Sequence, residues 1–304
     1  MNEETASITF NEGCVIERDY IYASSKIDSL DPAEYDYSRM HFFHKLNWFH
    51  HDLQWDVLSV CVSRKGDKRK CVAMSMQGDI AFQFVGGSEL EVIPDAGTLN
   101  GRGAMSQVRE IGDKLIACGY EGQVYVRQSS GWQVLGDGLF SFSSKKQPAH
   151  LNSIDGNKFE DIYAVGYFGR IFHFNGKKWS EIESPTNMHL ERVRVENGIA
   201  YICGNNGTVL RGNKDGFELI SIDNHENHFW GLERFNGKTY VADLDGLYVH
   251  EGANWAPVKM DIKGSVDTYR LDAYDGVMWS FGPKTIAQFD GSKWTRFAHP
   301  DNDE

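Results

Sequence analysis

A repeating pattern of apolar and polar positions runs through most of the chain. Each copy has an apolar strand, a tight turn containing glycine, a second strand, a small turn and a closing aromatic residue. The clearest copy is IYAVGYFGRIFHFNGKKW at residues 162–179. Its relatives lie at residues 115–132, 200–217, 239–255 and 278–294, with a weaker copy at 71–84 that lacks the closing aromatic. Short alternating segments bounded by glycine turns predict antiparallel β-strands.

Two independent markers keep the same register along the repeat. The turn glycines are Gly78, Gly122, Gly169, Gly207 and Gly246, and subtraction gives steps of 44, 47, 38 and 39 residues. The closing aromatics are Trp132, Trp179, Phe217, Trp255 and Trp294, with steps of 47, 38, 38 and 39 residues. A period of roughly 40 residues with four short strands in each unit is typical of β-propeller blades.

The apolar residues on both faces of each small sheet explain why such units would stack. A four-stranded sheet cannot bury both faces alone, whereas neighbouring sheets packed face to face around an axis bury them together. The sequence therefore predicts an all-β, seven-bladed β-propeller of four-stranded antiparallel blades that forms one domain over residues 1–304. Six blades with an N-terminal extension are the alternative. The closing tryptophans are expected in the core between sheets.

The limits of the blades follow from the two markers. Blades two to seven are expected at about 55–97, 104–140, 148–186, 188–224, 227–263 and 266–299. Residues 6–50 would form a degenerate first blade, or residues 8–10 would complete the last blade. Residues 300–304 are expected to be a flexible tail.

One segment, residues 24–54, does not follow the repeat and is rich in aromatic residues and histidine. We interpret it as an insertion that contacts a partner, because insertions into repeats often lie on a binding face. Its candidate binding residues are Phe43, Trp48 and His50. An amphipathic helix is an alternative, and a zinc site is disfavoured because the histidine spacing fits no common pattern. A second candidate contact contains His225, His228, Phe229 and Trp230.

The composition restricts the class of partner. The chain carries a net charge of −12, which disfavours general nucleic-acid binding and favours a basic protein partner. The N-terminus lacks the pattern of a signal peptide, and no apolar run is long enough to span a membrane. We interpret the five cysteines as reduced thiols and expect a cytoplasmic protein that is a monomer in isolation. No cofactor or metal is predicted.

Polar residues recur beside one apolar position in the first strand of several repeats. They are Arg109, Arg192, Arg194, Glu233, Arg270 and Asp272. Because side chains alternate between the faces of a strand, these residues would line the central channel of a propeller. Polar lining of a wet channel is the simpler interpretation. The alternative is an anion site, in which several arginines bind a carboxylate.

The unit G-x-x-G-x-[IV] followed by G-x-x-W is similar to the repeats of the YCF48-like photosystem assembly factors and of BNR-type propellers. The first resemblance implies an assembly factor for a membrane or cofactor complex. The second implies a sialidase-like hydrolase, with an arginine cluster beside Tyr269, Glu233 and Asp272. The segment FDGSKW at 289–294 departs from the Asp-box consensus, and the Arg-Ile-Pro motif is absent. Resemblance of fold alone does not establish function.

The sequence contains none of the common catalytic motifs. It therefore favours a non-catalytic, protein-binding scaffold. A more specific hypothesis is an acidic bacterial immunity or inhibitor protein that blocks a toxin or enzyme, and a basic, nuclease-like target would suit its charge. The alternatives are a hydrolase acting at the mouth of the channel and an assembly factor.

Overall fold

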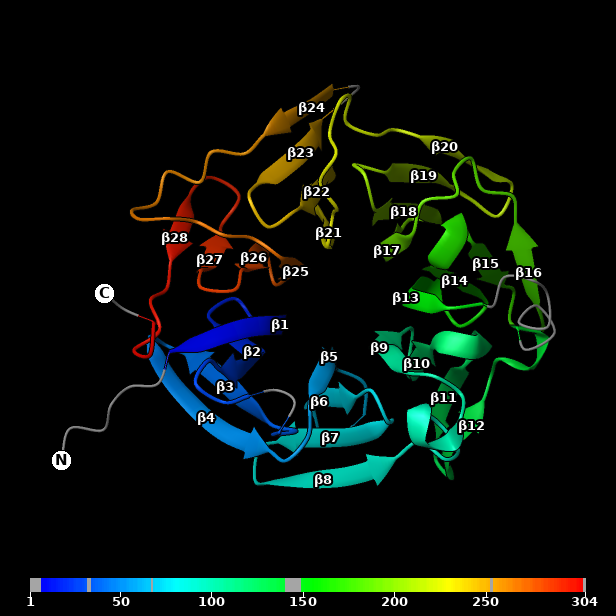
Figure 1. Cartoon of the computed structure of the whole chain (residues 1–304), viewed down its shortest axis with the longest axis horizontal. Helices are drawn as coiled ribbons and strands as arrows, with labels where there is room; N and C mark the ends of the chain where they lie inside the picture. The colour runs from blue at the N-terminus through cyan, green and yellow to red at the C-terminus, as the bar shows by residue number, and fades with distance from the viewer. Residues whose placement is uncertain (1–6, 32–33, 67, 140–148, 252–253, 303–304) are drawn as a thin grey trace. The chain divides into compact units, whose positions relative to one another are not determined.

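The computed structural model describes residues 7–31, 34–66, 68–139, 149–251 and 254–302. Within these ranges, seven four-stranded antiparallel sheets follow one another along the chain, and each contains four consecutive strands. The fold is a seven-bladed β-propeller (Figure 1). Contacts divide the chain into two compact units, one formed by residues 1–60 and 233–304 and the other by residues 61–232.

The first four sheets contain sixteen strands. They are β1 (Ile8–Glu17), β2 (Tyr20–Ile27), β3 (Ser38–His44), β4 (Asn47–Leu53); β5 (Val57–Ser63), β6 (Lys70–Ser75), β7 (Asp79–Phe84), β8 (Gly87–Val92); β9 (Met105–Ile111), β10 (Lys114–Gly119), β11 (Val124–Gln128), β12 (Gly131–Val134); and β13 (Leu151–Lys158), β14 (Asp161–Gly166), β15 (Ile171–Phe174), β16 (Trp179–Ile182).

The last three sheets have the same order. They contain β17 (Leu190–Glu196), β18 (Ile199–Gly204), β19 (Val209–Asn213), β20 (Gly216–Leu219); β21 (Gly231–Phe235), β22 (Lys238–Ala242), β23 (Leu247–Glu251), β24 (Asn254–Pro257); and β25 (Arg270–Tyr274), β26 (Val277–Phe281), β27 (Ile286–Phe289), β28 (Trp294–Arg296). Short 3-10 turns, η1 (Thr98–Asn100), η2 (Tyr120–Gly122) and η3 (Tyr167–Gly169), lie between strands.

The seven-blade prediction is confirmed, and the six-blade alternative is wrong. Residues 8–10 belong to β1 of a complete first sheet, while the last sheet supplies all four of its own strands. Segment 24–54 is therefore not an insertion or a helix, because it contains β3, β4 and the end of β2. Its hairpin lacks the glycine turn of the other blades, since Lys45 and Leu46 adopt the positive φ angles instead. Because these two residues occupy the turn in place of glycine, the sequence pattern did not reveal the first repeat.

The C-terminal segment is attached to the first strand. The side-chain oxygen of Asn302 accepts a hydrogen bond from the backbone N–H of Ile8 at 3.1 Å. The expected flexible tail therefore does not begin at residue 300, and its last two residues, 303–304, lie outside the described residues. No helix in the described ranges is long and apolar enough to cross a membrane.

Three of the four closing tryptophans pack in the core, as the repeat predicted, while Trp255 is half-buried. Trp132, Trp179 and Trp294 are buried. Trp179 packs on Phe174 in a cluster that also contains Ile116 of a neighbouring sheet. Each such contact removes apolar surface of two sheets from water, which stabilises the fold by roughly 25 cal/mol per Å².

All five cysteines are buried. Burial raises the pKa of Cys71 and of Cys118 to about 12. Because the thiolate is the nucleophilic form, these thiols have the properties of core residues and not of reactive groups.

Candidate functional site

The polar residues of the first strands connect neighbouring sheets within the 61–232 unit. Arg109 on β9 donates from Nε to Oδ1 of Asp155 on β13 at 2.7 Å. The other oxygen, Oδ2, accepts the backbone N–H of Val195 on β17 at 2.8 Å. A single buried carboxylate therefore bridges three successive sheets. Arg192 and Arg194 on β17 are also buried, and Arg194 donates to the carbonyl of Val193 at 3.1 Å.

A similar arrangement occurs within the unit formed by residues 1–60 and 233–304. Arg270 on β25 forms a 2.7 Å ion pair with Glu12 on β1. Asp272 accepts the backbone N–H of Val15 at 2.7 Å. Glu233 is buried and accepts the N–H of Arg234 at 2.9 Å. The contacts of Arg270 and Asp272 support a structural role in joining β25 to β1.

The same ion pairs weaken the anion-site interpretation. The charges of Arg109 and Arg270 are balanced by Asp155 and Glu12, respectively. A carboxylate ligand would have to compete with these short intramolecular pairs. A binding role for the first-strand residues remains a prediction.

The proposed contact residues on β3 and β4 are not all accessible. Phe43 is only 3% exposed and packs on Trp279 and Phe297, so it is a core residue and not a partner contact. Trp48 donates from its indole nitrogen to the carbonyl of Ala298 at 2.8 Å. His50 is exposed. Phe43 and Trp48 are cross-strand partners and His50 lies two residues along β4, so all three share one face of the sheet and differ in what covers them.

The histidines of the first sheet do not gather as metal ligands. His41 is buried, with Nε2 2.8 Å from the Ser25 hydroxyl and Nδ1 3.1 Å from Nε2 of His299. No group of three or more potential ligands occurs among the residues that the structure describes. Burial, together with the neighbouring His299, holds the pKa of His41 well below the usual histidine value of about 6.5.

This burial predicts a loss of stability in acid. Below about pH 6.5 the unfolded chain binds a proton at His41 that the folded chain excludes, so unfolding becomes more favourable as pH falls. The pKa of His51 is also lowered by burial and acts in the same direction. We expect the free energy of unfolding to be level above this pH and to fall by about 1 kcal/mol per pH unit below it. Urea unfolding between neutral pH and pH 5 measures this slope.

The matched variants are His41→Gln and His50→Gln. The first removes a buried imidazole and should reduce the slope, leaving the part that His51 contributes. The second replaces an exposed imidazole and should leave most of the slope in place. An unfolding free energy that does not vary with pH in the wild-type chain would contradict the assignment.

The same tight turn occurs in three sheets of the 61–232 unit, and in each it holds one residue in the left-handed backbone conformation. The turns lie at residues 119–122, 166–169 and 204–207, each beginning and ending with glycine. Their third residues, Glu121, Phe168 and Asn206, have φ angles of 56°, 61° and 51°. The final glycine is required, since a Cβ on Gly169 would lie 2.0 Å from the Thr186 carbonyl oxygen.

A histidine from the following loop accepts the backbone N–H of each left-handed residue. The donor–acceptor pairs, all to Nδ1, are Glu121 to His150 at 3.4 Å, Phe168 to His189 at 3.1 Å, and Asn206 to His228 at 3.2 Å. Burial lowers the pKa of His150, which favours the neutral ring that can accept this bond. The three histidines recur at steps of 39 residues by subtraction.

Aromatic side chains join these turns into one surface. The Tyr120 and Tyr167 hydroxyls are 2.7 Å apart. The Tyr120 ring lies 4.6 Å from that of His150, and the Tyr167 ring lies 4.3 Å from that of His189. We call this surface the histidine–aromatic face. It contains Tyr120, His150, Tyr167, Phe168, Met188, His189, Asn206, His228 and Trp230.

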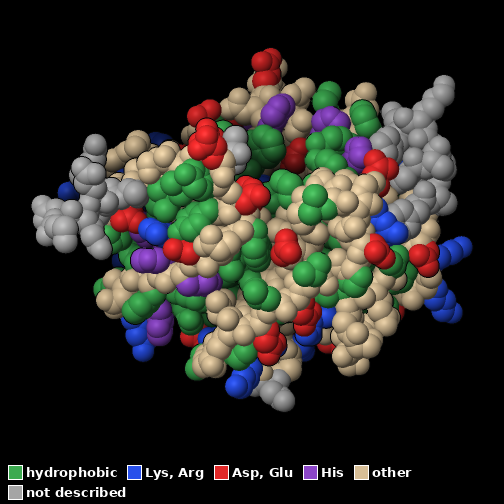
Figure 2. Space-filling view, turned by 60° about the horizontal axis from the view of Figure 1, so that its bottom comes forward, with side chains coloured by type: hydrophobic (Ala, Val, Ile, Leu, Met, Phe, Trp, Pro, Cys, Tyr) green, Lys and Arg blue, Asp and Glu red, His purple; other side chains and the backbone are tan. Residues whose placement is uncertain are grey.

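Phe168 is the most unusual residue of this face. Its side chain is 40% exposed although it is a large aromatic, and its backbone is in the left-handed region. Both features cost free energy, and strained backbone of this kind concentrates at functional sites. Hydrophobic and histidine side chains also lie together on the upper part of the surface in Figure 2. The face has the character of a protein-binding surface.

Sequence reasoning identified only part of the histidine–aromatic face. His228 and Trp230 were expected at a partner contact, and their rings lie 5.9 Å apart. His225 and Phe229 stack at 4.5 Å beside them, with Phe229 buried. His150, His189 and Phe168 were missed. Their signal was the 39-residue spacing of histidines before the first strand of a repeat.

Solved structures of similar fold are β-propellers. The WD40 β-propeller domain of Doa1 aligns with a TM-score of 0.70 and 10% identity over 93% of this chain and 92% of that chain. YCF48 bound to D1 peptide gives a TM-score of 0.65 and 15% identity over 97% and 93%. Virginiamycin B lyase from Staphylococcus aureus aligns with a TM-score of 0.66 and 12% identity over 80% of this chain and 84% of that chain. Identities this low support the β-propeller fold and no shared function. The YCF48-like resemblance of the repeats is confirmed at the level of the fold.

A sequence relative gives more specific information. No family model matches the chain. The curated immune protein Tsi7 of Pseudomonas aeruginosa is 32% identical over 247 residues, which cover 80% of this chain and 80% of that protein. Identity at this level over most of both chains indicates common descent. The chain belongs to the family of the immune protein Tsi7.

Proposed function

We propose that this protein is an immunity protein that protects a bacterial cell by binding a protein toxin and blocking it. The observation that carries the proposal is the 32% identity to an immune protein over 80% of the chain. The relationship indicates a non-catalytic protein with a propeller scaffold. Direct binding is the simplest means by which a non-catalytic scaffold neutralises a toxin.

The histidine–aromatic face is the proposed toxin-binding surface. Hot spots of protein interfaces are enriched in tyrosine, tryptophan and other large aromatic residues held in fixed positions. Phe168 projects from a turn whose backbone is bonded to His189, and Tyr167 is bonded to Tyr120. Little side-chain entropy would be lost when these groups contact a partner.

The charge of the chain favours a basic toxin. The net charge is −12, and Glu121 lies beside the histidine–aromatic face with its carboxylate 3.8 Å from Nε2 of His150. An acidic protein accelerates encounter with a basic partner. The proposed complex contains one copy of each protein and forms in the cytoplasm.

The test uses the candidate toxin encoded beside the gene for this chain. Purified toxin and full-length chain are mixed at micromolar concentration, and the mass of the complex is measured by light scattering after gel filtration. Growth of cells that express the toxin is measured with and without the chain. We expect a one-to-one complex and restored growth. Restored growth without a complex would overturn direct binding.

A further inference from the structure

Closing tryptophans use their indole N–H group at the junctions between sheets. Trp179 donates from Nε1 to the carbonyl of Leu135 at 2.8 Å, and Leu135 directly follows β12 of the neighbouring sheet. Trp48 donates to the carbonyl of Ala298, which follows β28. In both cases the acceptor is a backbone carbonyl on the segment that leaves the adjacent sheet, whereas Trp132 donates to the carboxylate of Glu91 on β8 at 3.0 Å.

Trp294 occupies the corresponding position in the last sheet but lacks this bond. Its side chain is only 8% exposed, and within the described residues its indole nitrogen forms no hydrogen bond but is reached by solvent. The segment that would supply the carbonyl begins at Val258, directly after β24. A pocket of about 540 Å³ lies there, lined by Trp294 and Val258 together with Tyr240 and Phe289.

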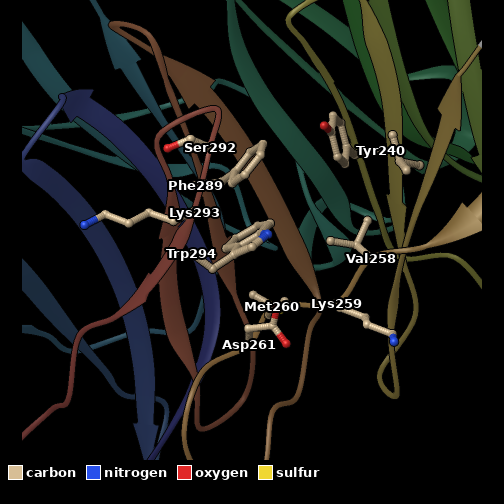
Figure 3. Close-up of a pocket in the computed structure, with 10 residues that line it drawn as sticks. Tyr240, Val258, Lys259, Met260, Asp261, Phe289, Ser292, Lys293 and Trp294 are labelled. Atoms are coloured by element: carbon tan, nitrogen blue, oxygen red, sulfur yellow. The ribbon is translucent and has the colours of Figure 1, made fainter.

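Figure 3 shows how this pocket, which we call the Trp294 pocket, is arranged. Trp294 and Phe289 form one wall, with ring centroids 5.1 Å apart, and Tyr240 and Val258 lie opposite. The indole nitrogen faces the space between the walls, and Met260 and Asp261 lie at one end. The amino groups of Lys259 and Lys293, which complete the rim, point away.

We propose that the Trp294 pocket binds an apolar side chain and the adjacent backbone carbonyl from an extended segment of a protein partner. The walls would enclose the side chain, and the indole N–H would donate to the carbonyl. The indole N–H can bond to water while the pocket is open, so a ligand that displaces this water must offer an acceptor of its own. The volume lies within the range of about 300–1,000 Å³ that is usual for ligand pockets.

The chain itself provides the precedent for this ligand. Leu135 offers both groups to Trp179, because its carbonyl accepts the indole N–H and its side chain packs on the same cluster. Asp261 at the end of the pocket disfavours a carboxylate as the acceptor, since two negative charges would lie close together. A neutral amide carbonyl beside a leucine-like side chain fits better. The identification of the partner as the toxin rests on the proposed function.

The experiment uses N-acetyl-leucine methylamide as the probe and the full-length chain labelled with ¹⁵N at its tryptophan indoles. The resonance of Trp294 is assigned by its loss in Trp294→Phe. We expect that resonance to shift saturably at millimolar probe, with the other indole resonances unchanged. N-acetyl-glycine methylamide, which has the carbonyl but no side chain, should give no saturable shift. N-acetyl-leucine with a free carboxylate should bind more weakly.

Two variants distinguish the parts of the proposal. Val258→Trp fills the pocket and should abolish the shift of Trp294. Trp294→Phe keeps an aromatic wall but removes the N–H donor, and it should lower the affinity for the probe about five-fold. This affinity is measured by the broadening of the probe's methyl signals. The dispersion of the remaining indole resonances shows that each variant is folded.

The outcomes separate this inference from the proposed function. If the Trp294 resonance shows no saturable shift, the proposal that this pocket is a binding site is wrong, whether or not the toxin binds the chain. Suppose that the probe shifts Trp294 but Val258→Trp leaves the toxin affinity unchanged. This result would show that no toxin segment occupies the pocket, while the toxin complex itself would stand. A ten-fold or greater loss of toxin affinity in Val258→Trp would support both parts.

Discussion

Replacing Phe168 with glycine should weaken binding to the toxin about 100-fold without destabilising the chain. The exposed aromatic ring is the most prominent apolar group of the histidine–aromatic face, and truncation of a central hot-spot residue costs about 2–3 kcal/mol of binding free energy. Glycine adopts a φ of 61° without strain, so the free energy of unfolding should stay level or rise by up to about 1 kcal/mol. Calorimetric titration with the toxin and urea unfolding measure the two quantities.

Glu121→Gly is the matched control for this substitution. Glu121 has the same left-handed conformation in the preceding sheet, so glycine relieves the same strain there without removing an aromatic ring. We expect the gain in stability but only a small loss of affinity, because exposed charges contribute little to binding. Equal losses of affinity in the two variants would show that the turn backbone matters and not the Phe168 ring. Unchanged toxin affinity in Phe168→Gly would contradict the proposal that the toxin binds the histidine–aromatic face.

The regular part of the fold could be predicted from the sequence because turn glycines and closing aromatics repeat in register. Each marker has a local physical cause: Gly169 lies too close to the Thr186 carbonyl for any Cβ, and Trp179 fills the space between sheets. The first sheet has a tryptophan, Trp48, in its fourth strand, but its last hairpin lacks a glycine. Lys45 and Leu46 adopt the left-handed turn angles there, and no alternation pattern reveals that these residues tolerate them.

The candidate site was harder to predict because its contacts join residues of different repeats. The sequence places Arg109 at a polar position of a first strand, but the partner Asp155 lies 46 residues away in the next sheet. His228 was selected for its aromatic neighbours, while its bond to Asn206 depends on the angle between two loops. The missing acceptor of Trp294 could not be predicted, since the sequence of that repeat resembles the others.

Asp155→Ala should destabilise the chain by about 3–4 kcal/mol. Its carboxylate is nearly fully buried and binds two groups from two other sheets, the guanidinium of Arg109 and the backbone N–H of Val195. Removing it leaves a partly buried positive charge and a buried N–H group without their acceptor, which is the costliest kind of polar substitution. The loss is measured as the shift of the urea unfolding midpoint at pH 7.

Asp215→Ala is the matched control, because Asp215 is an exposed carboxylate that pairs with the exposed Lys214. Its removal should change stability by less than about 0.5 kcal/mol. The comparison also decides between the two interpretations of the first-strand arginines. If they serve mainly to bind an anion, Asp155→Ala would release Arg109, strengthen binding of a carboxylate such as citrate and cost little stability. If they join the sheets, the variant should unfold readily and citrate should not restore it, because no free carboxylate can also accept the Val195 N–H in the same geometry.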